Sequence, residues 1–186
     1  VLLVNREFIP LLAPIAARLE SVRRFVLIDD EHGSMEGPVV FDAEYEALLA
    51  RGCAEHVFED FDENAQATLF YTTGTTGLPK GVCFSHRQLV LHTLGVATSI
   101  GTAAAGAAMR TSDVYMPITP MFHVHAWGFP YVATLLGLKQ VYPGRYLPAN
   151  LLKLIVSEGV TYSHCVPSIM QMLLSHPGSE SFDLKG

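Results

Sequence analysis

Glycines, hydroxyl groups and one lysine are concentrated in residues 67–88, where an apolar run gives way abruptly to a short loop. Gly74 and Gly77 can adopt positive φ and have no Cβ, so the backbone N–H groups beside them can approach an anion closely. Lys80 adds a point charge on a flexible side chain. Four hydroxyl groups can donate to phosphate oxygens, those of Thr72, Thr73, Thr75 and Thr76. These residues predict a phosphate-binding loop.

The loop is not a Walker sequence, because G-x-x-x-x-G-K-[ST] occurs nowhere in the chain. An ordinary Gly/Thr turn between two strands is the alternative that these residues alone leave open. Pro79 and Gly81 disfavour a helix within the loop. The helix begins after it, because Ser85-His86-Arg87-Gln88 fits the capping box S/T-x-x-E/Q.

A second cluster, residues 121–131, combines two histidines with several aromatic residues and the chain's only tryptophan, Trp127. Such density on a connection from a strand to a helix predicts the wall of a binding pocket, and ordinary aromatic core is the alternative. His123 and His125 could also form a metal-binding pair, since residues i and i+2 share one face of a strand. No carboxylate or cysteine lies beside them, which argues against zinc.

The elements that must position these two clusters alternate between strands and helices. Apolar runs predict strands at residues 1–4, 24–28, 82–84, 113–120, 139–142 and 160–164. Helical spacing predicts helices over residues 6–20, 43–51, 126–136, 148–158 and 167–175, besides the one from His86. We expect Asp42 to cap the second helix, and Gly52 and Gly159 to follow two of them. Repeated β-then-α units predict an α/β fold with a doubly wound, mostly parallel sheet flanked by helices.

Composition limits the classes of protein that fit. Charged residues make up 16% of the chain, where ~25% is typical, and the sequence starts at Val1 within an apolar run. We therefore expect the chain to be the inner part of a larger protein. The net charge of −6 offers no basic footprint for nucleic acid. The three cysteines are widely spaced, which favours reduced thiols and a cytoplasmic location.

Residues 88–109 contain no charged side chain and are numerous enough to span a membrane. Their many glycine, alanine and threonine residues make the segment far less apolar than a leucine-rich span. We therefore predict a buried helix that runs into a loop, and no integral membrane segment.

The string Tyr71–Val82 closely resembles the phosphate loop of the adenylate-forming superfamily, which includes acyl-CoA synthetases, firefly luciferase and peptide-synthetase adenylation domains. Met121–Trp127 resembles the Met-Phe-His-Val-Asn-Ala-Trp form found in medium- and long-chain fatty acyl-CoA synthetases, with His125 in place of the usual asparagine. Val166-Pro167-Ser168 resembles the family's Val-Pro-Thr turn. The resemblance runs through residues 64–176 and more loosely through those before.

This resemblance implies an ATP-dependent fatty-acid–CoA ligase, which joins a fatty acid to AMP and then to coenzyme A. It implies catalytic roles for Lys80, Thr72 and His123, and a Mg²⁺ contact at Thr72. The residues that it assigns to ATP are Thr72, Thr73, Gly74, Thr75, Thr76, Gly77 and Lys80. Those that it assigns to the acyl chain are His123, Trp127, Val166, Pro167 and Ser168.

The resemblance also implies that residues 1–186 are part of the N-terminal AMP-binding domain. Residues 1–66 would then be scaffold, 67–88 the phosphate loop and 113–176 the acyl pocket. The family's later motifs and its C-terminal domain are absent, so we expect the 186 residues alone to be inactive and to require the rest of their own chain. A homodimer is a further hypothesis. The alternatives are an aryl-CoA ligase, another adenylating enzyme of the superfamily, or a non-catalytic nucleotide- or acyl-binding module.

Overall fold

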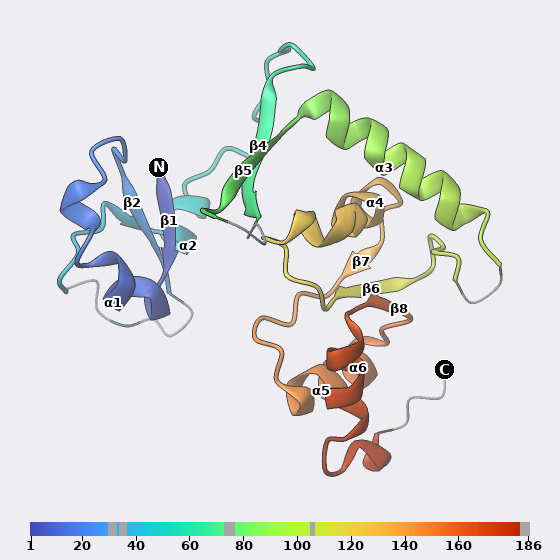
Figure 1. Ribbon diagram of the computed structural model, residues 1–186. Coiled ribbons are helices and arrows are strands. Elements are labelled where there is room, and N and C mark those ends of the chain that lie inside the picture. Colours follow the sequence, from blue (N-terminus) through green and yellow to red (C-terminus); the bar gives the residue numbers. More distant parts are fainter. Residues whose placement is uncertain (30–32, 34–36, 73–76, 105–106, 183–186) are drawn as a thin grey trace. The chain divides into compact units, whose positions relative to one another are not determined.

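The computed structural model describes residues 1–29, 33, 37–72, 77–104 and 107–182. Within it the chain divides into two compact units, Val1–Glu59 and Asp60–Gly186 (Figure 1).

The first unit is built on a small parallel sheet in the order β1-β2-β3. Its strands are β1 (Leu2–Asn5), β2 (Phe25–Ile28) and β3 (Ala43–Glu44), followed by helix α2 (Tyr45–Leu49). Asp29, just after β2, is buried and accepts two hydrogen bonds of 2.7 Å from the Arg6 guanidinium. The core of the unit consists of Val4, Leu12, Leu27, Val39 and Phe41.

The predicted helix over residues 6–20 is wrong in its continuity. The structure has a 3₁₀ turn at Arg6–Phe8, helix α1 at only Ile9–Leu12, and a second 3₁₀ turn at Ala16–Arg18. Pro14 explains the break, because it has no N–H to donate and disfavours the helical conformation of the residue before it.

The predicted caps of the second helix are also wrong. The N-cap of α2 is Glu44, whose carboxylate accepts from the N–H of Ala47 at 2.9 Å. Asp42 instead accepts hydrogen bonds from the backbone N–H of Phe25 and from Arg24. The helix ends at Leu49 with Ala50 as its C-cap, two residues before Gly52.

The second unit begins with an antiparallel hairpin of β4 (Gln66–Thr72) and β5 (Lys80–Ser85), followed by helix α3 (His86–Gly101). The predicted capping box at the start of α3 is confirmed. Gln88 N–H donates to Ser85 Oγ at 3.2 Å, and Ser85 N–H donates to Gln88 Oε1 at 2.9 Å. In the part of the chain that the structure describes, no helix is long and apolar enough to span a membrane.

The rest of the second unit surrounds a parallel sheet in the order β7-β6-β8. Central strand β6 (Val114–Pro117) is followed by α4 (Phe129–Leu135) and β7 (Lys139–Gln140). Helix α5 (Pro148–Glu158) then leads to β8 (Tyr162–His164) on the other side of β6, and α6 (Pro167–Leu174) follows. A short 3₁₀ turn lies at Ser179–Ser181.

Strand β6 is buried on both faces. Tyr115 packs into a core shared with α3 and α4, whereas the neighbouring Met116 packs into a core shared with α5 and α6. Figure 1 shows these two helix pairs on opposite sides of β6. The predicted α/β fold, with mostly parallel strands between layers of helices, is confirmed. Gly159 has φ 66° at the end of α5, as predicted for its cap.

Candidate active site

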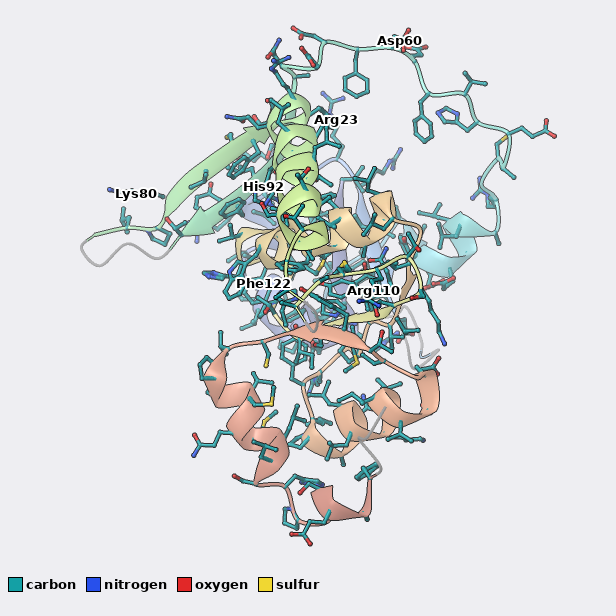
Figure 2. The ribbon with its side chains drawn as sticks, turned by 90° about the vertical axis from the view of Figure 1, so that its right-hand side faces the viewer. Arg23, Asp60, Lys80, His92, Arg110 and Phe122 are labelled. Carbon is teal, nitrogen blue, oxygen red and sulfur yellow. The ribbon has the colours of Figure 1, made fainter. Side chains whose placement is uncertain are left out.

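The hairpin places two of the predicted site residues directly opposite one another. Thr72 is the last residue of β4 and pairs with Lys80, the first residue of β5. Lys80 is exposed at the outer end of the hairpin (Figure 2). Gly77 has φ +99°, a conformation that glycine adopts without a steric penalty. The predicted contributions of Thr73, Gly74, Thr75 and Thr76 lie outside the described residues.

One face of the hairpin carries both of these residues and an aromatic pair. Because side chains alternate along a strand, Phe70 lies on the same face of β4 as Thr72. Its ring stacks on that of Phe84 in β5 at 5.6 Å. His125 meets both rings edge to face, at centroid distances of 4.9 Å and 5.9 Å. The structure therefore brings the hairpin that carries the predicted phosphate loop into contact with the histidine and tryptophan cluster.

That cluster has an unusual backbone. Four consecutive residues other than glycine have positive φ, between 48° and 58°: Val124, His125, Ala126 and Trp127. Gly128 continues the run with φ 78° and is the N-cap of α4. We call Val124–Gly128 the left-handed turn. The left-handed conformation costs roughly 1–2 kcal/mol per residue for L-amino acids, so surrounding contacts must hold it. The predicted helix over residues 126–136 is therefore wrong at its start, since α4 begins at Phe129.

Two histidines from other elements hydrogen-bond to the carbonyl groups of this turn. His92 of α3 places Nε2 3.2 Å from the carbonyl oxygen of Trp127. His164 of β8 places Nε2 3.1 Å from the carbonyl oxygen of Ala126. Its other ring nitrogen, Nδ1, lies 3.3 Å from the hydroxyl oxygen of Tyr115. Close packing accompanies the first contact, because a Cβ on Gly128 would lie 2.6 Å from His92 Nε2.

The environment of the turn favours neutral imidazoles. Burial lowers the pKa of His164, against the opposing effect of its hydrogen bond to Ala126. Burial, and secondarily the charge of His92, lower the pKa of His125. The His164 ring stacks on Phe129 at 4.4 Å and lies 5.6 Å from the indole of Trp127.

The predicted acyl residues fall in two places. His123 is exposed and is the N-cap of the left-handed turn, while Trp127 within it keeps 44% of its surface exposed. Val166, Pro167 and Ser168 begin α6, immediately beyond β8. Trp127 contacts His164 at the end of β8, the strand that leads into this second segment. In the described ranges, no three His, Cys, Asp or Glu side chains gather as a metal site requires.

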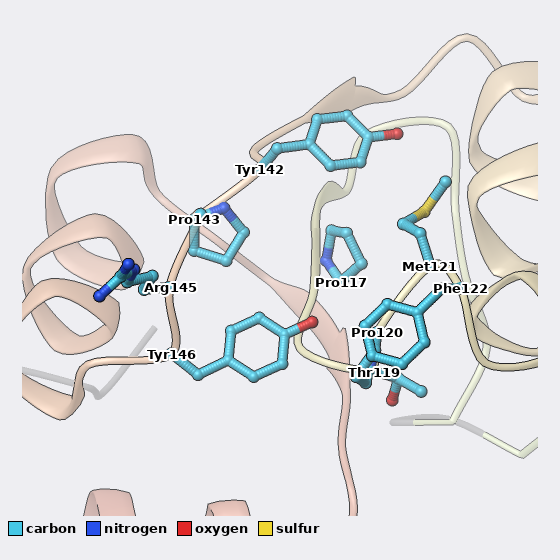
Figure 3. A pocket seen from close by; sticks show the side chains of 10 residues that line it. Pro117, Thr119, Pro120, Met121, Phe122, Tyr142, Pro143, Arg145 and Tyr146 are labelled. Carbon is cyan, nitrogen blue, oxygen red and sulfur yellow. The ribbon is translucent and has the colours of Figure 1, made fainter. Parts of the chain in front are cut away.

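A pocket of about 460 Å³ opens where β6 ends (Figure 3). One wall is the segment after β6, with Thr119, Met121 and Phe122. The other is the segment after β7, with Tyr142 and Tyr146. Sequence reasoning missed this second wall, which carries neither a motif nor a histidine. Its position follows the rule that ligands bind beyond the carboxyl ends of parallel strands.

A smaller pocket of about 70 Å³ lies beneath the left-handed turn. It is lined by Phe84, Leu89, His92, Val124, His125, Gly128 and Tyr131.

The chain is similar in sequence to known CoA ligases. The chain is 42% identical over 186 residues to the long-chain-fatty-acid–CoA ligase of Thermus thermophilus, covering 100% of this chain and 32% of that protein. It is 40% identical over 177 residues to the 3-methylmercaptopropionyl-CoA ligase of Ruegeria lacuscaerulensis, covering 95% of this chain and 32% of that protein. The chain thus spans about a third of the length of these curated relatives.

A solved structure shares the fold. The anthranilate CoA ligase AuaEII in complex with anthranoyl-AMP matches with a TM-score of 0.74 and 20% identity, covering 98% of this chain and 33% of that chain. The family described as AMP-binding enzyme matches residues 1–186. Because that match runs the whole length of the sequence, the chain belongs to the AMP-binding enzyme family.

Proposed function

We propose that this chain supplies the phosphate loop and part of the acyl pocket of an ATP-dependent fatty-acid–CoA ligase. The observation that carries the proposal is the hairpin, which sets Thr72 opposite Lys80 on the face that meets His125. A phosphate site and an apolar, histidine-bearing wall on one surface suit a reaction between a nucleotide and a lipid acid. The relative at 42% identity supports the choice of a fatty acid.

The proposed reaction has two steps. The carboxylate oxygen attacks the α-phosphorus of ATP, the bond to the β-phosphate breaks, and pyrophosphate leaves. The thiol of coenzyme A then attacks the acyl carbonyl and AMP departs. Lys80, the Thr72 hydroxyl and the loop residues Thr73 to Gly77 would bind the β- and γ-phosphates and stabilise the charge that develops on pyrophosphate.

The remaining roles are proposed from the resemblance to the fatty acyl-CoA synthetases. His123 and Trp127 would bound the carboxylate end of the acyl chain, with Val166, Pro167 and Ser168 further along. Thr72 offers a hydroxyl oxygen, a hard ligand of the kind Mg²⁺ accepts beside its waters and phosphates. When bound, Mg²⁺ would neutralise phosphate charge. A cytoplasmic location is part of this proposal, and the free cysteines Cys53, Cys83 and Cys165 support it.

The test uses the longer natural protein that contains this sequence. Lys80→Ala should lower the rate of pyrophosphate release by roughly 10²–10³-fold, the effect of removing one preorganised stabilising group. Lys153→Ala on α5, another exposed lysine, is the matched control and should leave the rate unchanged. Loss of ATP affinity in Lys80→Ala, with no pyrophosphate release from the unmodified protein, would instead identify a non-catalytic binding module.

A second candidate is a ligase for a short or aromatic acid. The 40% identity to a 3-methylmercaptopropionyl-CoA ligase favours it, as does His125 at the position where the fatty acyl-CoA synthetases have asparagine. A panel of aliphatic acids of increasing length, with benzoate and 3-methylmercaptopropionate, separates the two candidates. The fatty-acid proposal requires AMP formation to be fastest with a medium- or long-chain acid.

A further inference from the structure

Two carbonyl groups of the left-handed turn lie within hydrogen-bond distance of a histidine nitrogen, one of His92 and one of His164. For His164, the second contact of its ring indicates which of its two nitrogens carries the proton. Burial raises the pKa of Tyr115, so its hydroxyl stays protonated and can donate to His164 Nδ1. A neutral imidazole that accepts at Nδ1 carries its proton on Nε2. The Nε2 proton is then directed at the carbonyl of Ala126, 3.1 Å away. Tyr115, His164 and Ala126 thus form one hydrogen-bonded chain.

We propose that His164 is a positioning residue for the acyl boundary: its Nε2 proton holds the Ala126 carbonyl, and thereby fixes the direction in which the turn presents Trp127. His92 assists from α3 through the carbonyl of Trp127. The acyl boundary is the edge of the acyl site that His123 and Trp127 would form in the proposed function, and this part of the inference rests on that function. The geometry of the turn itself does not depend on that function.

The two hydrogen bonds from His92 and His164 restrain the part of the backbone that has positive φ. The two bonded carbonyls belong to Ala126 and Trp127, both in the left-handed conformation that their side chains disfavour. Trp127 remains partly exposed, so packing alone does not fix its ring. His164 contacts the turn twice, through the Ala126 carbonyl and through its ring contact with Trp127 at 5.6 Å. Loss of the Nε2 proton donor should therefore change the exposure of the indole more than the stability of the fold.

Trp127 is the only tryptophan of the chain, so its fluorescence reports the turn without any assay of activity. His164→Phe keeps a ring that can stack but removes both nitrogens. We expect its tryptophan emission to shift to longer wavelength and acrylamide quenching to rise about twofold. His164→Gln retains an amide donor at the ε position and should restore values close to the original. Identical quenching in the original and His164→Phe proteins would overturn the proposal.

A second variant keeps His164 and tests the same proposal if the His164→Phe protein does not fold. Tyr115→Phe removes only the hydroxyl that donates to Nδ1, so the proton is no longer confined to Nε2. Quenching of Trp127 should rise to a level between those of the original and His164→Phe proteins. An unchanged value in Tyr115→Phe would count against the proposal independently.

The pH dependence of the emission supplies a readout that a purely structural role would not give. In the described contacts, Tyr115 from β6 meets His164 directly, and Tyr162 from the same strand as His164 contacts Tyr115 and Phe129, the two rings that stack on His164. Burial raises the pKa of both tyrosines. Below the ordinary histidine pKa of ~6.5, protonation makes Nδ1 a donor, so the hydrogen bond from the Tyr115 hydroxyl must reverse its direction and the emission should change. The transition should persist in His92→Gln and vanish in His164→Gln. Its persistence in His164→Gln would contradict the assignment.

Kinetics of the longer natural protein then test the link to acyl binding. His164→Phe should raise KM for the fatty acid on the order of tenfold, the effect of a small change in an apolar pocket, and leave KM for ATP unchanged. His164→Gln should reverse most of that increase. If the unmodified protein activates no acid, the proposed function fails while the fluorescence result still decides the role of His164. An equal rise in both KM values would show general damage and overturn the acyl role.

Discussion

At the scale of single residues, Gly128 leaves no room for a side chain beside His92. A Cβ at position 128 would lie 2.6 Å from Nε2 and 2.7 Å from Cδ2 of His92, and the residue has φ +78°. Gly128→Ala should therefore incur the left-handed backbone penalty of roughly 1–2 kcal/mol and also displace His92 from the Trp127 carbonyl. Loss of that hydrogen bond adds about 1 kcal/mol. Urea unfolding of the chain, followed by circular dichroism, measures the sum.

The fold provides a matched control for this prediction at Gly137. This residue also has positive φ, at 68°, but a Cβ there would meet nothing within 4 Å. Gly137→Ala should thus carry only the backbone penalty. The difference between the two variants should disappear when each is combined with His92→Ala. Equal destabilisation by Gly128→Ala and Gly137→Ala would show that the contact with His92 contributes nothing.

Four residues of the candidate site show what the sequence could and could not predict at the scale of single residues. Thr72 and Lys80 are predicted as phosphate ligands because hydroxyls, glycines and a lysine close together have a recognisable chemistry, and the hairpin pairs the two residues. His92 and His164 were missed as partners of the turn, because each lies in a helix or strand far along the chain from the carbonyl that it contacts. Only the tertiary fold brings those carbonyls within 3.2 Å and 3.1 Å of the two rings.

At the scale of elements, α3 depends on its N-terminal cap. Ser85→Ala removes the acceptor for the N–H of Gln88 and should destabilise the second unit by about 0.5–2 kcal/mol. Ser99→Ala is the control on the same helix, where the hydroxyl bonds only to the carbonyl of Gly95 in the preceding turn. Such a bond adds little to a helix, and alanine has the higher helix propensity, so this change should be close to neutral. Thermal unfolding of both variants measures the contrast, and equal shifts would refute a role for the cap.

Element boundaries were predictable wherever a local signal determined them. The capping box of α3 and the glycine after α5 act within one turn of the chain, and both were identified correctly. The helix predicted for residues 6–20 is wrong because Pro14 interrupts it, although the apolar residues keep helical spacing on both sides. The left-handed turn gave only a weak local signal: His125 and Gly128 tolerate positive φ, but Val124, Ala126 and Trp127 do not favour it. The contacts that surround the turn come from elements far along the chain, α3, β8 and the hairpin of β4 and β5.

At the scale of the whole molecule, the two units have separate cores. The residues that pack around β6 all come from the second unit, and those around β2 all come from the first. The chain between them carries no helix or strand from Gly52 to Glu63, and there Phe58 is 83% exposed and Phe61 62% exposed. Each unit should therefore retain its fold when this connection is cut.

Limited digestion with chymotrypsin tests that independence. The earliest cuts in the first 62 residues should follow Phe58 or Phe61, because a protease needs an extended, accessible segment, whereas Phe41 is buried and should be spared. The variant with Phe58→Ser and Phe61→Ser should be cut more slowly in this region.

The larger fragment should keep the Trp127 emission spectrum of the intact chain, since every residue that contacts the left-handed turn lies after position 60 in the described contacts. A shifted spectrum after a single cut would mean that the first unit stabilises the candidate site, and that the hairpin and the turn are not sufficient to define it.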